Sequence, residues 1–295
     1  MSSVLELLPV PTSHSFISQR TRLNYLDWGN PHAPLLILQH GGRDHAHSWD
    51  CVARELCQDW HVIAPDLRGH GDSAWSPDGA YFMPYFIYDF AQLIEQLSVK
   101  SVSIVAHSLG GNIATLYSGI FPEKVRRLVN IEGLGPSPEL LAQLDGKTPD
   151  AIWRNWIAQR RSTAARLPRR YTTIDEAFAR MHAENGNLTA EQARHLTIHG
   201  IGRNEDGSWS WKFDNYLHSY LPLNISHPDR EYLWGQITCP VLLMHGAKSW
   251  EPSPAEDGRA MHFRNVRVVV FKESGHWLHH DQFSDFIREI KVFLG

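Results

Sequence analysis

One serine in this chain has the surroundings of a catalytic nucleophile. Ser108 lies in the segment 106–111 (AHSLGG), which directly follows the apolar run 101–105 (SVSIV). Where a buried strand turns sharply into a helix, small neighbours permit close approach, and the serine is held in a strained conformation that exposes its hydroxyl. Ala106 stands where this pattern more often has glycine, and it preserves the small size. The segment therefore predicts a nucleophilic serine at a strand-to-helix turn.

A serine hydroxyl is a poor nucleophile at neutral pH and needs a base within hydrogen-bond reach. His276 is the best candidate for this base, because it follows the last predicted strand and precedes the last predicted helix. His107 adjoins Ser108 but is expected to point away from it, and His279 and His280 fall near the start of the final helix. We therefore predict that His276 faces the serine.

Short apolar runs alternate with helix-like segments, which is the pattern of a mostly parallel sheet covered on both faces. The predicted core strands are 35–39, 61–65, 102–106, 127–131, 241–244 and 266–271. The predicted core helices are 49–58, 83–97, 110–121 and 282–293. Ligands bind beyond the carboxyl ends of the strands in open α/β sheets. His40, Ser108, Glu132 and His276 each follow such an end, so we expect them at one edge of the sheet.

The stretch from 135 to 235 interrupts this alternation. It carries no convincing buried strand, and it contains helix-like pieces at 151–165 and 174–183. We interpret it as a helical lid inserted into an α/β core that comprises residues 1–134 and 236–295.

Composition argues against several classes of partner and location. The 295 residues are 42% hydrophobic and 20% charged with a net charge of −4, which favours a globular protein without nucleic-acid or membrane partners. The opening segment 1–11 does not resemble a signal peptide, and no apolar run approaches the ~20 residues of a membrane span. Cys51, Cys57 and Cys239 lack metal-ligand spacing, so we expect reduced thiols and a cytoplasmic location. We expect a monomer or homodimer.

Four motifs, taken in order, resemble those of the α/β-hydrolase fold superfamily in its lid-bearing form. They are 40–42 (HGG), 66–73 (DLRGHGDS), 106–111 (AHSLGG) and 274–277 (SGHW). Within the superfamily, 131–136 (IEGLGP) and the region of 207–209 (GSW) are similar to serine hydrolase-like proteins. The resemblance implies a mostly parallel central sheet with helices on both faces and an inserted lid. It also implies that 66–73 is a structural turn, and this segment lacks the lysine of a phosphate-binding loop.

The position expected to hold the acid that orients His276 departs from the pattern of the α/β-hydrolase superfamily that the chain resembles. Three residues after Gly246, that pattern has aspartate, whereas this chain has Ser249. Glu132 at the end of strand 127–131 is our choice of acid, since one group of haloalkane dehalogenases is similar in carrying its acid there. Glu251 and then Asp257 are the alternatives, and in a purely structural role Glu132 would cap a turn before the lid.

Hydrolysis also requires two donors for the oxyanion that forms on the attacked carbonyl. The amide of Leu109 follows the serine at a helix start, where the helix dipole favours negative charge. The amide of Gly42, after the first core strand, is expected to supply the second donor.

Substrate contacts are expected from side chains near the mouth of the site. Arg43 follows the oxyanion segment, and Trp250 lies in the loop that lacks the usual aspartate. Trp153 and Trp156 are three residues apart and therefore share a helix face. These side chains predict a small-molecule substrate with an apolar or aromatic group.

Neither a metal nor a cofactor is expected. Asp44, His45 and His47 are ligand types for a metal, but we interpret them as a polar loop. The arginines between 154 and 170 are interpreted as a solvated helix face, with the alternative that one of them binds a substrate carboxylate.

Together these residues predict a cofactor-independent serine hydrolase that cleaves a carboxylic ester, including a lactone, through an acyl-enzyme. The serine at 108 argues against the chemistry of resembling haloalkane dehalogenases and epoxide hydrolases, which use aspartate at this turn. Amide or carbon–carbon bond hydrolysis on the same three residues stays open. So do a cofactor-free non-hydrolytic enzyme and a binding protein that retains the pocket.

Overall fold

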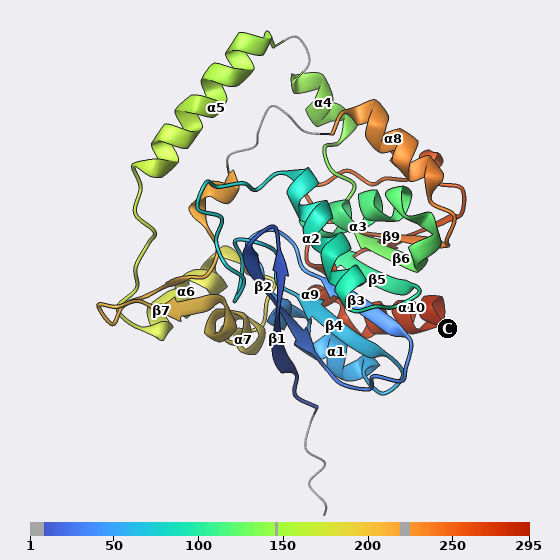
Figure 1. Ribbon diagram of the computed structural model, residues 1–295, viewed down its shortest axis with the longest axis horizontal. Coiled ribbons are helices and arrows are strands. Elements are labelled where there is room, and N and C mark those ends of the chain that lie inside the picture. The colour runs from blue at the N-terminus through green and yellow to red at the C-terminus, as the bar shows by residue number, and fades with distance from the viewer. Residues whose placement is uncertain (1–8, 145–146, 219–224) are drawn as a thin grey trace, which may run out of the picture.

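The computed structural model of the protein describes residues 9–144, 147–218 and 225–295, and one large β-sheet forms its centre (Figure 1). The eight strands follow the order β1-β2-β4-β3-β5-β6-β9-β10. Their bounds are β1 Thr12–Ser18, β2 Thr21–Asp27, β3 Leu35–Gln39, β4 His61–Pro65, β5 Val102–His107, β6 Val125–Ile131, β9 Val241–Gly246 and β10 Val266–Phe271. The β1–β2 and β2–β4 pairs are antiparallel and the others are parallel. The expected mostly parallel sheet is confirmed.

Helices cover both faces of this sheet, which explains why every residue of β3, β5 and β9 is buried. The core helices are α1 Asp50–Leu56, α2 Met83–Gln96, α3 Leu109–Ile120, α9 Leu278–Asp281 and α10 Phe283–Leu294, joined by the short helices η1 Ala46–Trp49, η2 Pro122–Lys124 and η4 Arg259–His262. Residues of α2 and α3 pack in the core on one face, and residues of α1 and α10 pack on the other. None of the helices in the described ranges has the length and apolar composition needed to cross a bilayer.

The β1–β2 hairpin at the edge of the sheet lies outside the strands that the sequence predicts. In β1 only Phe16 and Ser18 are buried, and the other five residues are exposed. A strand that is buried on both faces shows a continuous apolar run, whereas this edge strand does not. The strand signal is therefore weak in this part of the sequence.

The chain between β6 and β9 leaves the sheet and then returns to it. It forms α4 Pro138–Leu144, α5 Pro149–Ala164, α6 Ile174–Glu184, α7 Ala190–Gly200, β7 Ile201–Arg203, β8 Trp209–Trp211, η3 Asn215–His218 and α8 His227–Gln236. In Figure 1, α6, α7 and the β7–β8 hairpin lie together at one end of the molecule, and α5 lies at its outer edge. Trp234 of α8 is 1% exposed and packs into the core of the sheet. The last helix of this inserted segment therefore belongs to the packing of the core.

Candidate active site

Ser108 occupies the turn between β5 and α3 in an unusual backbone conformation. Its φ of 51° and ψ of −118° lie outside the regions that non-glycine residues normally adopt. Strain of this kind costs about 1–3 kcal/mol and is concentrated at functional sites. The Ser108 amide donates to the Ile131 carbonyl at 2.8 Å, and a Cβ on Gly110 would lie 2.4 Å from the His40 carbonyl oxygen. The close packing of strand and helix thus explains the small residues of the motif.

Glu132 directly follows β6, and its buried carboxylate accepts hydrogen bonds on both oxygens. Oε2 accepts from His276 Nδ1 at 2.5 Å and from Ser249 Oγ at 2.6 Å. Oε1 accepts from the Gly246 amide at 2.8 Å, and His245 Nδ1 lies 3.0 Å from it without hydrogen-bond geometry. Burial by itself raises the pKa of Glu132, but the surrounding nitrogen and hydroxyl groups outweigh burial and lower it to about 2. Glu132 is therefore an anion at neutral pH.

His276 lies between β10 and α9 and is held at two points. Its Nδ1 faces Glu132, and its backbone carbonyl accepts a hydrogen bond from His107 Nε2 at 3.0 Å. The side chain of His276 remains 20% exposed, so Nε2 is the ring nitrogen left to act on a substrate. In the described part of the chain, the Ser108 and His276 side chains form no hydrogen bond with each other. Such bonds are often long in free enzymes and shorten when substrate binds.

Two aromatic rings flank the ring of His276. The His107 centroid lies 4.6 Å away, and the Trp250 centroid lies 5.1 Å away. Burial, followed by the neighbouring charge of His276, lowers the pKa of His107, so His107 is a neutral donor to the His276 carbonyl. The sequence missed this contact because it joins two segments that are 169 residues apart. A short motif carries no signal for such a contact.

The two other carboxylates considered as the acid bind Arg259 instead. Asp257 Oδ2 lies 2.7 Å from Arg259 Nε, and Glu251 Oε2 lies 3.5 Å from Arg259 Nη2. Burial raises the pKa of Glu251, against the opposing effect of the Arg259 charge. Among these three candidates, Glu132 is the one that the described structure brings into hydrogen bonding with His276.

The loop after β3 packs directly against the serine turn. A Cβ on Gly41 would lie 2.8 Å from His107 Nδ1 and 3.1 Å from Ser108 Cβ, so the approach requires glycine. A Cβ on Gly42 would lie 3.9 Å from Leu109 Cδ2, which places Gly42 beside the first residue of α3. The Leu109 amide has no acceptor within its own helix, because it lies in the first turn. The two expected oxyanion donors therefore come from adjacent segments.

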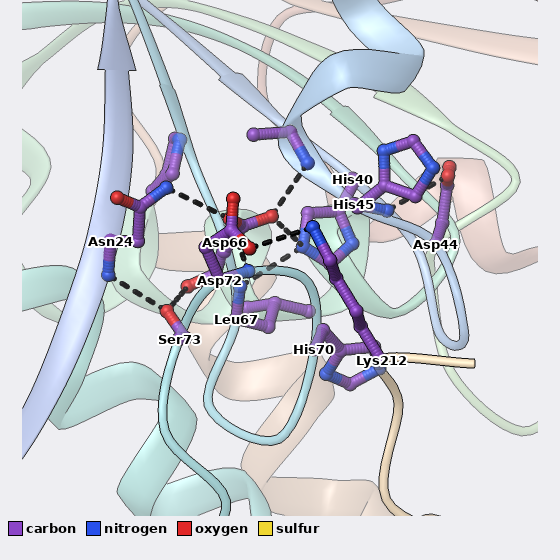
Figure 2. Close-up of polar contacts among 12 residues, drawn as sticks. Asn24, His40, Asp44, His45, Asp66, Leu67, His70, Asp72, Ser73 and Lys212 are labelled. Carbon is purple, nitrogen blue, oxygen red and sulfur yellow. Dashed lines mark hydrogen bonds and ion pairs between the residues drawn. The ribbon is translucent and has the colours of Figure 1, made fainter. Parts of the chain in front are cut away.

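Asp66, which directly follows β4, anchors the turn 66–73 (Figure 2). Its Oδ1 accepts from the Ala46 amide at 2.7 Å, and its Oδ2 accepts from the Asp72 amide and Asn24 Nδ2, both at 3.0 Å. A buried carboxylate whose oxygens are occupied in this way is a structural group. These bonds support the structural interpretation of 66–73.

The same turn is tied to two other parts of the chain, as Figure 2 shows. The Leu67 amide donates to His40 Nε2 at 3.0 Å, which fixes the first residue of the 40–42 motif. Lys212, which follows β8, donates through Nζ to Asp72 Oδ1 at 2.7 Å. The inserted segment is thus connected to the turn that supports the site.

The expected substrate contacts fall in different places. Trp250 is 73% exposed and lies beside the His276 ring. Arg43 is exposed, follows Gly42 and has a φ of 62°. Trp153 and Trp156 share a face of α5 as expected, with ring centroids 5.6 Å apart and planes at 90°. Of the three tryptophans, only Trp250 has a described ring contact with His276.

Comparison with known proteins agrees with this fold. A family model described as the alpha/beta hydrolase fold matches residues 34–283. The chain is 28% identical to the esterase Rv0045c of Mycobacterium tuberculosis over 94% of its own length and 87% of that protein. It is 30% identical to the 3-hydroxybutyrate-oligomer hydrolase of Cupriavidus necator over 77% of each chain. It is 26% identical to a serine hydrolase-like protein of Danio rerio over 74% of its own length, but only 66% of that relative, just under two thirds.

Solved structures give the same result. The thioesterase domain from the curacin biosynthetic pathway aligns with a TM-score of 0.80 at 22% identity, covering 96% of this chain and 99% of that domain, and shows the fold alone. The structure of the M. tuberculosis esterase Rv0045c aligns with a TM-score of 0.75 at 25% identity, covering 97% and 92%. The chain belongs to the α/β-hydrolase fold family. It is an enzyme, and its class is hydrolase.

Proposed function

We propose that this hydrolase cleaves carboxylic esters through an acyl-enzyme, with Ser108 as nucleophile, His276 as base and Glu132 as acid. The observation that carries the proposal is the 2.5 Å hydrogen bond between Glu132 Oε2 and His276 Nδ1, at the edge of the sheet where the strained serine turn lies. The similarity to an esterase over 94% of the chain supports an ester substrate.

In the acylation step, Ser108 Oγ attacks the ester carbonyl carbon and gives its proton to His276 Nε2. The Glu132 carboxylate stabilises the imidazolium and holds the ring with Nδ1 protonated. The amides of Gly42 and Leu109 donate to the oxyanion of the tetrahedral intermediate. Each such donor contributes about 2.7–4 kcal/mol to transition-state stabilisation in well-studied hydrolases.

Collapse of the intermediate breaks the bond to the alcohol, which leaves with the proton held on His276 Nε2. Water then attacks the acyl carbon of the ester on Ser108, with His276 as the base. The second tetrahedral intermediate releases the acid and returns the proton to Ser108 Oγ. A lactone follows the same steps, except that its alcohol and acid remain one molecule.

The substrate is proposed to be a small molecule with an apolar or aromatic group. The exposed Trp250 ring beside His276 supports this choice, because it offers an apolar surface next to the catalytic nitrogen. Arg43, beside the oxyanion loop, is proposed as a second contact. Trp153 and Trp156, which share a face of α5, are proposed as further apolar contacts.

The proposal includes residues 135–235 as a lid over the core, a monomer or homodimer, and a reducing, cytoplasmic setting. Free thiols at Cys51, Cys57 and Cys239 support the reducing setting. No nucleic-acid or membrane partner is part of the proposal.

The proposal is tested with a series of p-nitrophenyl esters of increasing acyl length and a set of aryl lactones. We expect saturable hydrolysis with a burst of p-nitrophenol equal to one equivalent of enzyme, and Ser108→Ala should lower kcat by roughly 10⁴-fold or more. Ester turnover that survives in Ser108→Ala would contradict the nucleophile assignment.

The same variant separates the remaining enzyme classes. A cofactor-free oxygenase that uses His276 to deprotonate its substrate should retain turnover in Ser108→Ala and should consume oxygen. An amide or carbon–carbon hydrolase should also lose activity in Ser108→Ala. In that case the wild type should prefer anilides or aryl diketones to esters. A binding protein turns over none of these substrates.

A further inference from the structure

A second group of chemically active side chains lies outside the site described above. One ligand atom each from His47, Asp50 and His199 lies within 4.8 Å of the other two. His47 belongs to η1 and Asp50 begins α1, so both are part of the core, whereas His199 lies in the last turn of α7. His195, one turn earlier on α7, also reaches the group, with Nε2 3.2 Å from Asp50 Oδ2. The group therefore joins the core to the inserted segment.

We propose that His47, Asp50 and His199 form a binding site for a divalent transition-metal ion such as Zn²⁺. His195 lies beside this site, but its Nε2 also contacts the His47 carbonyl oxygen at 3.0 Å, so we do not count it as a ligand. Imidazole nitrogens with one carboxylate oxygen are a donor set that zinc, nickel and copper prefer, whereas magnesium and calcium prefer oxygen donors. Asp44 and His45, the other ligand types in this loop, stay outside the site. His45 Nε2 is engaged with the Leu196 carbonyl at 2.9 Å.

The spacing of the donors is near that required for the ion. His47 Nδ1 lies 3.0 and 3.1 Å from the two carboxylate oxygens of Asp50. Zinc–nitrogen bonds of about 2.0–2.1 Å place tetrahedral donors roughly 3.3 Å apart, so this pair is already at ligand spacing. The His47 and His199 rings stack with centroids 3.9 Å apart, and a rotation of the half-buried His199 side chain is the main adjustment. On metal binding, the Nδ1 hydrogen of His47 moves to Nε2.

Burial and charge also suit a cation. The Asp50 side chain is 4% exposed, whereas those of His47 and His195 are 21% and 31% exposed, so the anion is buried beneath accessible imidazoles. Arg54 Nη2 lies 3.9 Å from Asp50 Oδ2, beyond hydrogen-bond distance. The near neighbours of the Asp50 carboxylate are therefore histidines. On metal binding, their contacts with the carboxylate would be replaced by bonds to the ion.

The position of the site determines what a bound ion does. Because η1 follows the loop that contains Gly42, an ion held by both η1 and α7 fixes the inserted segment against the oxyanion loop. It also stabilises the folded chain, because metal binding to the native state shifts the unfolding equilibrium.

Titration calorimetry of Zn²⁺ into the chelator-treated full-length protein tests the proposal. We expect one equivalent to bind the wild type and the control His32→Ala, which removes an exposed histidine of the β2–β3 loop. His199→Ala and His47→Ala should each weaken that binding by more than about tenfold, and Mg²⁺ should not compete. Co²⁺ as a probe should give the visible absorption of a tetrahedral site in the wild type, and this absorption should be lost in His199→Ala.

Thermal unfolding in the presence of chelator shows which variants are folded, and the folded ones decide the test. Absence of a saturable one-equivalent site in the wild type would overturn the proposal. Unchanged Zn²⁺ affinity and Co²⁺ absorption in a folded His199→Ala or His47→Ala protein would also overturn it. Either result would leave the group as a structural hydrogen-bond cluster around Asp50.

Discussion

Glu132 and His276 form a 2.5 Å hydrogen bond although 144 residues separate them. The sheet order explains how they meet, because β9 lies between β6, which Glu132 follows, and β10, which precedes His276. The Glu132 amide donates to the Met244 carbonyl of β9 at 3.1 Å, which fixes the backbone position from which the Glu132 side chain extends. From that position the carboxylate crosses the end of β9, where Ser249 Oγ donates to it. Serine at 249 thus supports an acid that comes from the neighbouring strand.

Replacing this acid should remove most of the activity. We expect Glu132→Gln to lower kcat by roughly 10³–10⁴-fold, because an amide keeps the size of the side chain but cannot stabilise the imidazolium. Ester hydrolysis under saturating substrate measures the effect, and thermal unfolding checks the fold. The matched control is Glu251→Gln, which should change kcat by no more than a few-fold, since Glu251 pairs with Arg259. A larger loss in Glu251→Gln than in Glu132→Gln would reverse the assignment.

A carboxylate at position 249, in the loop after the neighbouring strand β9, should partly replace Glu132. Ser249 Oγ lies 2.6 Å from Glu132 Oε2, so a carboxylate at position 249 reaches the space next to His276 Nδ1. The double variant Glu132→Gln/Ser249→Asp should therefore recover at least about tenfold in kcat over Glu132→Gln alone, because it restores an anion for the imidazolium. Ser249→Asp in the wild-type background is the control, where two carboxylates compete for one site. No recovery in a folded double variant would count against the proposed geometry.

Stability should depend on pH through Glu132. Its pKa of about 2 in the folded protein lies below the ordinary value of 4.5, so its contribution is complete above about pH 5 and is lost as the pH falls toward 2. The two pKa values differ by an amount equivalent to roughly 3 kcal/mol. Urea unfolding of the wild type and Glu132→Gln between pH 6 and pH 3 measures this contribution. We expect the free-energy difference between the two proteins to shrink below pH 5, and a constant difference would contradict the prediction.

The buried glycine at 41 should matter for catalysis because it packs against the serine turn. In Gly41→Ala the new methyl group would lie 2.8 Å from His107 Nδ1, so the oxyanion loop must move away from the serine turn. We expect kcat/KM to fall roughly 10–100-fold, as small displacements of catalytic groups do. Gly186→Ala is the control, because a Cβ there meets nothing within 4 Å. Equal, small effects of the two substitutions would show that the loop does not position a catalytic donor.

The sheet could be predicted well where its strands are buried on both faces. The predicted strands 35–39 and 61–65 coincide with β3 and β4, because continuous apolar runs end abruptly at polar or glycine residues. Ser108 could be identified for a related reason, since the close packing at its turn restricts the neighbouring residue types. The β7–β8 hairpin could not be predicted, because each strand has three residues and none of the three in β8 is fully buried.

The hydrogen-bond partners of Glu132 could not be predicted from the sequence. From the sequence, Ser249 is only a missing carboxylate, whereas in the structure it is a donor to Glu132. The contact of His245 with Glu132, and that of His107 with the His276 carbonyl, depend on strand order and register across the sheet. Tertiary pairing of this kind leaves no local pattern in the chain.

Reaction of the full chain with a fluorophosphonate, followed by intact-mass and peptide analysis, tests directly whether Ser108 is a nucleophile activated by His276 and Glu132. We expect one adduct per chain, located on Ser108, with labelling that slows by orders of magnitude in Glu132→Gln. A folded wild-type chain that stays unmodified, or that carries its adduct on another residue, would contradict this assignment.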